Sequence, residues 1–311
     1  FTVTALAWQV SDITMPDAST NLLDVHFVGT EGWIIGNATN EEGKMYRIQE
    51  PNTVTSFSIP TTVTPRKKMS ASESLEFCTS LYMKDSSHVY TGTTYGYLLF
   101  YNGSNWIKKD ASSSIINSVH FPSTGNGYCC GGPDYIGVID TASPPVITDF
   151  SKPAPGWPFS DIFSLNSSNI WVTSVNEVFN YNGSQWFPRY GSLPQSVSSI
   201  YFVDSTNGWV LCNKQSIHKY NGEEDIWWSP QNLPSGLGTV VLTDLFFINS
   251  SEGWIVGSNN GHALIIHTTN GGTSWSIQYD NSATPQLNAL YMTSADKGYA
   301  VGNNNTVLIY K

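Results

Sequence analysis

The chain has 311 residues, of which 12% are charged and 13% are aromatic, and its net charge is −10. A chain of this length can bury a large core without a metal ion or a disulfide. The acidic balance and the presence of only three arginines (Arg47, Arg66 and Arg189) disfavour nucleic acids and anionic membrane surfaces as partners, because both require basic patches. No apolar run is long enough to insert into a membrane.

Seven copies of one pattern of short strands follow one another along the chain. The opening strands alternate apolar and polar residues, and they lie at residues 22–27, 78–83, 116–121, 159–165, 197–203, 242–248 and 287–292. A short buried run follows in each copy, at residues 32–36, 88–92, 127–131, 170–174, 208–212, 253–257 and 298–302. The third strands begin at Met45, Tyr97, Ile136, Val178, Ile217, His262 and Thr306.

The copies recur at a spacing of about forty residues, which is the period of a propeller blade. One such unit cannot bury both faces of its own sheet, so the copies must stack. The pattern therefore predicts an all-β fold, a seven-bladed β-propeller formed by one domain over residues 1–311. The alternative, a two-sheet sandwich, does not explain why the same order of strands recurs seven times.

The seventh copy ends after its third strand, and the N-terminus holds the missing piece. ALAWQV (5–10) places Trp8 where Trp106, Trp186 and Trp275 stand in their copies. We therefore expect the N-terminal strand to pair with residues 306–310 and to close the ring without an open strand edge.

Two long connections, at residues 50–77 and 141–157, are rich in Pro, Ser and Thr and are expected to be surface loops. The first of them is also the place for the fourth strand that the first blade otherwise lacks. It contains the only basic cluster, Arg66-Lys67-Lys68, which is either a solvated loop face or a partner contact.

Four cysteines do not form a disulfide framework. Cys78, Cys129, Cys130 and Cys212 are expected to be buried thiols or to form one bridge, with Cys78 and either Cys129 or Cys130 as the candidate pair.

No catalytic motif with a serine nucleophile, a zinc-binding HExxH or a phosphate loop is present. His26 and His120 recur at one strand position, where packing is favoured over metal ligation. Carboxylates gather in two turns, Glu41-Glu42 and Glu223-Glu224-Asp225, where solvation is the expected state. We therefore predict no catalytic residue, no metal and no cofactor; a glycosidase would need two acids that face each other across a pocket.

The sixth copy resembles the repeats of Ycf48-type photosystem assembly factors and of the wider Asp-box (BNR) propellers. The resemblance lies in LTDLFFI, SEGWIVG and TTNGGTSW, where Asn270 replaces the aspartate of the Asp-box pattern. It implies a seven-bladed propeller and a secreted or lumenal location. Ycf48-like factors are expected to carry an arginine-rich patch, and Asp-box sialidases three convergent arginines; the scattered arginines of this chain fit neither.

Loop polarity divides the propeller into two faces. The first rim carries the links between second and third strands and the links between blades, and the second rim carries the remaining turns. The sequons Asn102, Asn166, Asn182 and Asn249 fall on the second rim, and Asn37 and Asn304 fall on the first rim beside the seam. If these sites carry glycans, the unshielded surface is the first rim over blades two to six.

We expect partner binding on that surface, at Tyr95, Asp134, Tyr135, Asn176, Glu177, Lys214 and His262. Aromatic residues outside the repeat pattern, Tyr95, Tyr135, Trp157 and Trp227, are candidates for stacking on a partner or a sugar. The sequence thus favours a secreted, non-enzymatic binding or structural module at a cell surface or in an extracellular assembly, with a protein partner or a second copy. The alternative is a carbohydrate-directed propeller, either a lectin or a glycosidase.

Overall fold

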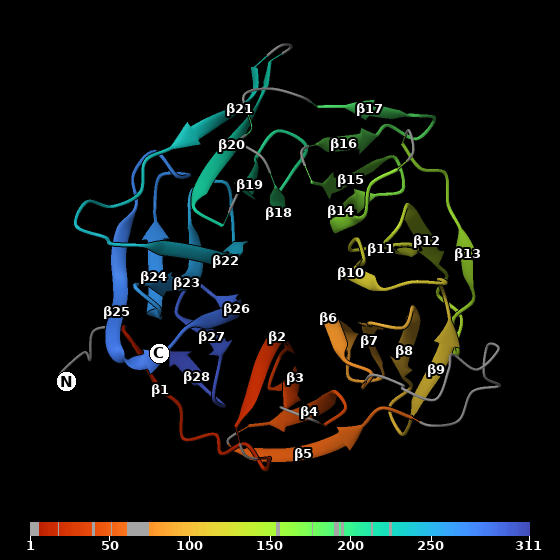
Figure 1. The fold of residues 1–311 in the computed structure, drawn as a ribbon, viewed down its shortest axis with the longest axis horizontal. Coiled ribbons are helices and arrows are strands. Elements are labelled where there is room, and N and C mark those ends of the chain that lie inside the picture. The colour runs from red at the N-terminus through yellow and green to blue at the C-terminus, as the bar shows by residue number, and fades with distance from the viewer. Residues whose placement is uncertain are drawn as a thin grey trace.

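Seven four-stranded antiparallel sheets stand around a central axis (Figure 1). The computed structural model describes residues 6–17, 19–38, 41–50, 52–60, 75–153, 156–175, 177–189, 193, 196–212, 214–223 and 226–311. Over these ranges there is no helix that could cross a membrane. The architecture is the predicted seven-bladed propeller.

Blades one to six run from their innermost to their outermost strand in chain order, whereas blade seven takes its outermost strand from the N-terminal part of the chain. Blades one to three comprise β2 (Thr20–Val28), β3 (Glu31–Ala38), β4 (Lys44–Gln49) and β5 (Thr53–Ser58); β6 (Cys78–Asp85), β7 (His88–Thr93), β8 (Tyr97–Tyr101) and β9 (Trp106–Asp110); and β10 (Ile116–His120), β11 (Gly127–Gly131), β12 (Tyr135–Ile139) and β13 (Ile147–Asp149). Blades four and five comprise β14 (Phe159–Asn166), β15 (Asn169–Ser174), β16 (Val178–Tyr181) and β17 (Trp186–Pro188); and β18 (Val197–Phe202), β19 (Gly208–Cys212), β20 (Ser216–Glu223) and β21 (Ile226–Gln231). Blades six and seven comprise β22 (Val240–Phe247), β23 (Gly253–Asn259), β24 (His262–Thr268) and β25 (Ser276–Pro285); and β26 (Leu287–Ser294), β27 (Lys297–Gly302), β28 (Val307–Tyr310) and β1 (Trp8–Val10).

The N-terminal strand closes the ring, as the sequence predicts. In β1, Trp8 pairs with Tyr310 and Val10 pairs with Leu308 of β28, and β1 lies beside the C-terminus in Figure 1. The Trp8 indole N–H donates to Gln278 Oε1 at 2.9 Å, and Trp254 donates to the same oxygen at 3.0 Å. The seam therefore combines main-chain pairing with a shared side-chain acceptor in blade six.

The glycine before the recurring Trp or Tyr has a packing role. A Cβ atom on Gly32 would overlap the Phe27 ring, and one on Gly253 would overlap Phe247. Because the glycine leaves this space, the phenylalanine at the end of the inner strand folds back over the second strand. The ring of Phe247 then stacks on Trp209 of the preceding blade at 3.5 Å between centroids.

The cores lie between neighbouring blades, and the recurring Trp residues fill them. Trp33 of blade one packs against Trp106 of blade two at 5.0 Å, and Trp254 and Trp8 belong to the same core between blades six and seven. This packing explains why the tryptophan at the outer strand recurs in so many copies, and why the last copy takes it from the N-terminus.

The four cysteines are buried and free, so that of the two alternatives the buried thiols are confirmed and the candidate pair of Cys78 with Cys129 or Cys130 forms no bridge. Each thiol lies in a different interblade core. Cys78 Sγ contacts Met45 Sδ at 3.5 Å in the core between blades one and two. Burial raises the pKa of the Cys78 and Cys129 thiols to about 12. These cysteines therefore act as small apolar side chains.

The two long connections both contain a strand. The fourth strand of the first blade, β5, lies within the connection 50–77, as the sequence allowed. The interpretation of residues 141–157 as loop alone is wrong, since β13 pairs with β12 there. That strand has three residues and an exposed face, so it leaves almost no alternation in the sequence. The basic cluster Arg66-Lys67-Lys68 lies outside the described residues.

We expect Trp8→Ala to destabilise the fold by about 3 kcal/mol, because it empties a buried site at the seam and removes one of the two indole donors to Gln278. Chemical unfolding followed by far-ultraviolet circular dichroism measures the effect. Trp157→Ala, at a side chain that is 56% exposed, is the matched control and should leave the stability within about 0.5 kcal/mol of wild type. Equal unfolding midpoints for the two variants would contradict closure through Trp8.

Candidate functional site

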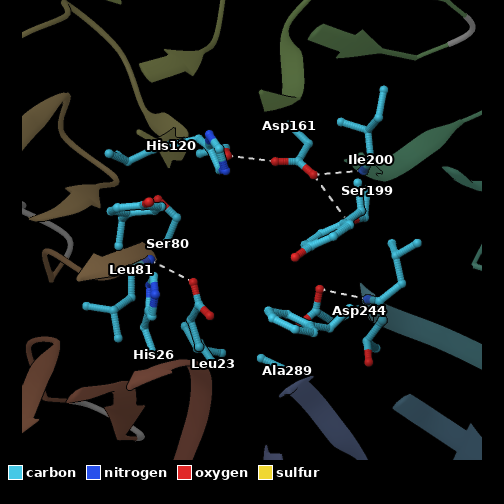
Figure 2. Close-up of a pocket in the computed structure, with 18 of the residues that line it drawn as sticks. Leu23, His26, Ser80, Leu81, His120, Asp161, Ser199, Ile200, Asp244 and Ala289 are labelled. Carbon is cyan, nitrogen blue, oxygen red and sulfur yellow. Dashed lines mark hydrogen bonds between the residues drawn. The ribbon is translucent and has the colours of Figure 1, made fainter. Parts of the chain in front are cut away.

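The inner strands of all seven blades line a central cavity of about 360 Å³ (Figure 2). Every inner strand has a bulge near its start. A bulge breaks the alternation of side chains, and four successive residues of each inner strand line the cavity. The first, second and fourth of these positions form three layers along the axis, beginning at the first rim.

The layers differ in chemistry. The polar layer, next to the first rim, consists of Leu23, Thr79, Asn117, Ser160, Ser198, Thr243 and Asn288. The carboxylate layer consists of Asp24, Ser80, Ser118, Asp161, Ser199, Asp244 and Ala289. The aromatic collar, nearest the second rim, consists of His26, Tyr82, His120, Phe163, Tyr201, Phe246 and Tyr291.

The three aspartates clamp neighbouring blades together. Asp24 accepts the N–H of Val25 in its own strand at 2.8 Å and the N–H of Leu81 in the next blade at 2.7 Å. Asp244 does the same with Leu245 at 2.8 Å and Leu290 at 2.9 Å. In each case one carboxylate satisfies two backbone donors near the bulges of two strands.

Asp161 makes the third clamp and has hydroxyl partners as well. It accepts the N–H groups of Ile162 and Ile200, both at 2.9 Å. Ser118 Oγ donates to it at 2.6 Å, and Ser199 Oγ donates to it at 3.2 Å. The three aspartates thus join blade one to two, four to five and six to seven, while Ser118 ties blade three to blade four.

Burial raises the pKa of all three carboxyl groups. The pKa of Asp24 rises to about 7, because desolvation outweighs the backbone hydrogen bonds and Asp161 adds repulsion. The pKa of Asp244 is raised well above its ordinary value by desolvation and then by Asp24 and Asp161. The pKa of Asp161 is raised by desolvation, against which its four hydrogen bonds act. Burial therefore favours the protonated form of these three carboxyl groups, and a cation among them would favour the carboxylate form.

The aromatic collar is continuous. Each of its seven rings contacts the next, with centroids separated by 4.1 to 5.3 Å around the full circle. His26 Nδ1 accepts the N–H of Met83 at 2.9 Å, and His120 Nδ1 accepts the N–H of Ser164 at 3.1 Å. Both histidines are thus interblade acceptors, in keeping with their predicted packing role.

The first rim is hollowed on both sides of the cavity mouth. One hollow of about 410 Å³ is lined by Pro158, Val175, Ser196, Val197 and Lys214, among others. The other, of about 490 Å³, includes Leu23, Asn37, Phe77, Cys78 and Thr94. Asn117 and Ser160 line both hollows and the central cavity. We call this continuous depression the rim groove.

The predicted partner-binding residues lie at the first rim, but they do not converge on one point. Asp134 pairs with Lys152 Nζ at 2.9 Å and accepts the N–H of Gly156 at 3.4 Å, so it holds the loop that leads to Trp157. Lys214 is exposed at the rim groove, and its carbonyl accepts the N–H of Leu242 at 2.6 Å.

The other predicted residues are more constrained. Tyr95 and Glu177 are half-buried in their turns, and Tyr135 packs against the core between blades two and three. His262 Nε2 lies 2.7 Å from Asp280 Oδ1. Asn176 lies outside the described residues.

Exposed apolar side chains mark one end of the rim groove. Trp157 is 56% exposed and Val175 is 39% exposed, on the links that flank Pro158 and β15. Trp227, by contrast, is half-buried beneath the guanidinium of Arg189, at 4.4 Å from its centroid. Of the four aromatic residues outside the repeat pattern, Trp157 is therefore the most exposed.

Four sequon asparagines share a local geometry. Asn102 Oδ1 accepts the N–H of Ser104 at 3.0 Å, and Asn182, Asn166 and Asn249 make the same bond to the residue two positions on. All four are exposed, as is Asn304. Asn37 is half-buried, and its amide donates to the Cys78 carbonyl at 3.3 Å.

Sequence reasoning missed the three aspartates of the cavity. A signal was present, because Asp24, Asp161 and Asp244 occupy one position in LLDVHF, FSDIF and LTDLFF. Within the described part of the chain, no group of three His, Cys, Asp or Glu side chains could hold a metal ion.

Comparison with known proteins shows a family similarity in the C-terminal part of the chain and a shared fold over the whole. Residues 164–311 match the model of the photosynthesis system II assembly factor YCF48. Two YCF48 structures share the fold over nearly the whole of both chains. YCF48 bound to a D1 peptide has a TM-score of 0.73 at 16% identity, covering 99% of this chain and 98% of that one. YCF48 from Cyanidioschyzon merolae has a TM-score of 0.68 at 13% identity, covering 98% of each.

Residues 164–311 are thus similar to YCF48, and the whole chain shares the fold of the YCF48 structures. An enzyme also shares this fold. A catalytically inactive variant of virginiamycin B lyase from Staphylococcus aureus with quinupristin has a TM-score of 0.76 at 10% identity, covering 98% of this chain and 99% of the lyase. No curated protein sequence matches the chain.

We expect the imidazole rings of His26 and His120 to stay neutral from pH 8 to about pH 5, because burial lowers the pKa of each to about 3. Since these pKa values lie below the unfolded value, the stability that the two rings contribute is present above about pH 6.5 and is lost as the pH falls towards 3. Nitrogen-15 correlation spectra of the side chains would report the protonation state. A titration midpoint near 6.5 in either ring would contradict the assigned acceptor role.

Proposed function

We propose that this propeller is a non-enzymatic binding module that holds an extended segment of a partner protein in the rim groove. The observation that carries the proposal is the exposed pair Trp157 and Val175 beside a hollow that continues across the cavity mouth. Exposed aromatic side chains next to a depression are typical anchors of protein interfaces.

The geometry of the groove supports an extended ligand. Its two hollows lie over different blades and meet at Asn117 and Ser160. Side chains of the polar layer offer hydroxyl and amide groups along the mouth, which can hydrogen-bond to a peptide backbone. That a YCF48 structure has been solved bound to a D1 peptide supports a peptide as the kind of ligand.

The arginine patch expected of Ycf48-like factors is not the basis of this proposal. Arg47 pairs with Glu31 at 2.6 Å in blade one. Arg189, in the link after blade four, lies over the ring of Trp227 in blade five. Recognition in this chain is therefore expected to depend on apolar and polar contacts of the rim groove.

A second candidate function is carbohydrate processing, which one observation favours. Asp24, Asp161 and Asp244 face a common cavity, and glycosidases use a pair of carboxyl groups across a pocket. Each of these aspartates also accepts two backbone N–H groups. Because that role is structural, we favour binding over hydrolysis.

Selection of peptides from a random display library on the immobilised propeller tests the binding proposal. We expect Trp157→Ala to weaken the selected peptides at least tenfold, as loss of an interface tryptophan commonly does. Val175→Ala should weaken them by a smaller factor. Val146→Ala is the matched control, since Val146 is 55% exposed but lies on the second rim, and it should change nothing.

Two results would contradict the proposal. One is peptide binding that is unaffected by Trp157→Ala and Val175→Ala. The other is a propeller that selects no peptide but gives one strong class of signal on a glycan array, which would favour the carbohydrate alternative.

We further propose that the protein is secreted and works in an extracellular assembly. The exposed sequons Asn102, Asn166, Asn182 and Asn249 support this, since each amide nitrogen is free of the turn bond made by its oxygen. A mass map of native protein should find glycans at these second-rim sites and none at Asn37. Unmodified asparagine at all six sequons would remove this support.

A further inference from the structure

The central cavity is polar where it meets the rim groove, acidic at its middle and aromatic beyond. Asp24, Asp161 and Asp244 come from blades one, four and six, so their carboxyl groups approach an occupant from different sides. Figure 2 shows Asp161 and Asp244 in the lining. Each carboxylate oxygen that accepts a backbone N–H keeps a second lone pair. The clamps therefore hold the carboxylates in place without using up their capacity to accept.

One polar atom in this layer has no explanation in the fold. The Ser80 Oγ atom is buried and has no hydrogen-bond partner among the described residues. Ser80 lines the cavity beside Leu81, whose N–H is held by Asp24. A buried hydroxyl without a partner is costly, and an occupant of the cavity would satisfy it.

The lining of the cavity favours a cation as its occupant. No lysine or arginine is found among the described residues that line the cavity, and both lining histidines accept backbone N–H groups as neutral rings. Like charges held together in a desolvated site favour a positively charged guest. The aromatic collar adds ring faces, which attract cations.

The cation is organic rather than metallic. In the part of the chain that the structure describes, no three acidic, histidine or cysteine side chains approach closely enough to bind one metal ion. Carboxylates spread around a cavity of about 360 Å³ suit a larger group with several donors and an apolar stem. An arginine or lysine side chain has both features.

We propose that the central cavity is a specificity pocket for a basic side chain, arginine or lysine, of the segment bound in the rim groove. This inference rests on the proposed function, because the segment passes the cavity mouth at Asn117 and Ser160. The stem of the side chain crosses the polar layer, and its charged end lies among Asp24, Asp161 and Asp244.

Calorimetric titration with Nα-acetyl-arginine methylamide tests the pocket on the intact protein without any peptide. The control ligand is the citrulline counterpart, which has the same shape and no charge. We expect the arginine compound to bind at least tenfold more tightly than the citrulline compound. Asp244→Asn should weaken the arginine compound about tenfold, as loss of a buried charge partner does, whereas Asp149→Asn, on the exposed outer strand β13, should leave the affinity unchanged.

A second variant keeps the test decisive if Asp244→Asn does not fold. Ser80→Lys removes a hydroxyl that has no partner and puts an ammonium group at the cavity. We expect this variant to fold, as circular dichroism and thermal unfolding would show, and to lose binding of the arginine compound. Wild-type affinity in Ser80→Lys would overturn the proposal.

Failure of this inference is distinguishable from failure of the proposed function. If peptides bind in a Trp157-dependent manner but replacement of their basic residues by glutamine leaves affinity unchanged, the pocket is wrong and the rim groove stands. If neither the arginine nor the citrulline compound binds to folded wild-type protein, or both bind equally, the pocket is wrong as well. If the arginine compound binds and no peptide does, the pocket stands and the rim groove is wrong.

Discussion

The fold depends on hydrogen bonds from backbone N–H groups of inner strands to side chains of the neighbouring blade. A bulge near the start of every inner strand disturbs the ladder, and unpaired donors inside a protein are costly. Asp24, Asp161 and Asp244 each satisfy a donor in their own blade and one in the next blade. Further along the axis His26 and His120 repeat the arrangement with ring nitrogens. The side chains that surround the cavity are thus the same ones that fix the blades relative to one another.

That constraint links architecture to the proposed binding. The three aspartates join six of the seven inner strands in pairs. The inner strand of the third blade is not in such a pair, and its Ser118 donates to Asp161 instead. Burial of three carboxyl groups in one cavity raises their pKa values, and repulsion adds to the shift of Asp24 and Asp244. A basic side chain from a partner would stabilise their charged forms, so that a structural requirement of the ring becomes a source of specificity at its centre.

The sequence was sufficient for the fold because the cores lie between repeats. Gly32 and Gly253 precede a tryptophan for a packing reason that recurs at Gly127, Gly208 and Gly298, and Trp8 could be matched to the missing outer strand because tryptophan recurs there in other copies. The sequence was insufficient where a contact depends on the relative rotation of two blades. Cys78 and Cys129 are in neighbouring blades, yet they belong to different cores, and only the packing of the sheets separates them.

The candidate site was harder to predict than the fold. The order of strands in each blade predicts which turns lie on which rim, and it placed Asp134 and Lys214 on the first rim. Whether a side chain in a turn points outward depends on the residues packed around it. Tyr135 turns into a core and Trp157 does not. The bulges also bring Asp24 and Asp161 into the cavity, which simple alternation of side chains along the strand would not predict. The position of a bulge could not be predicted from this sequence.

A crystal structure of the propeller with a peptide selected on it tests the central claim most directly. The account predicts continuous density for the peptide across the first rim, from Trp157 past Asn117 and Ser160, with a basic side chain descending between Asp24 and Asp244. Density confined to the second rim or to the outer strands, with the cavity filled by water alone, would contradict it.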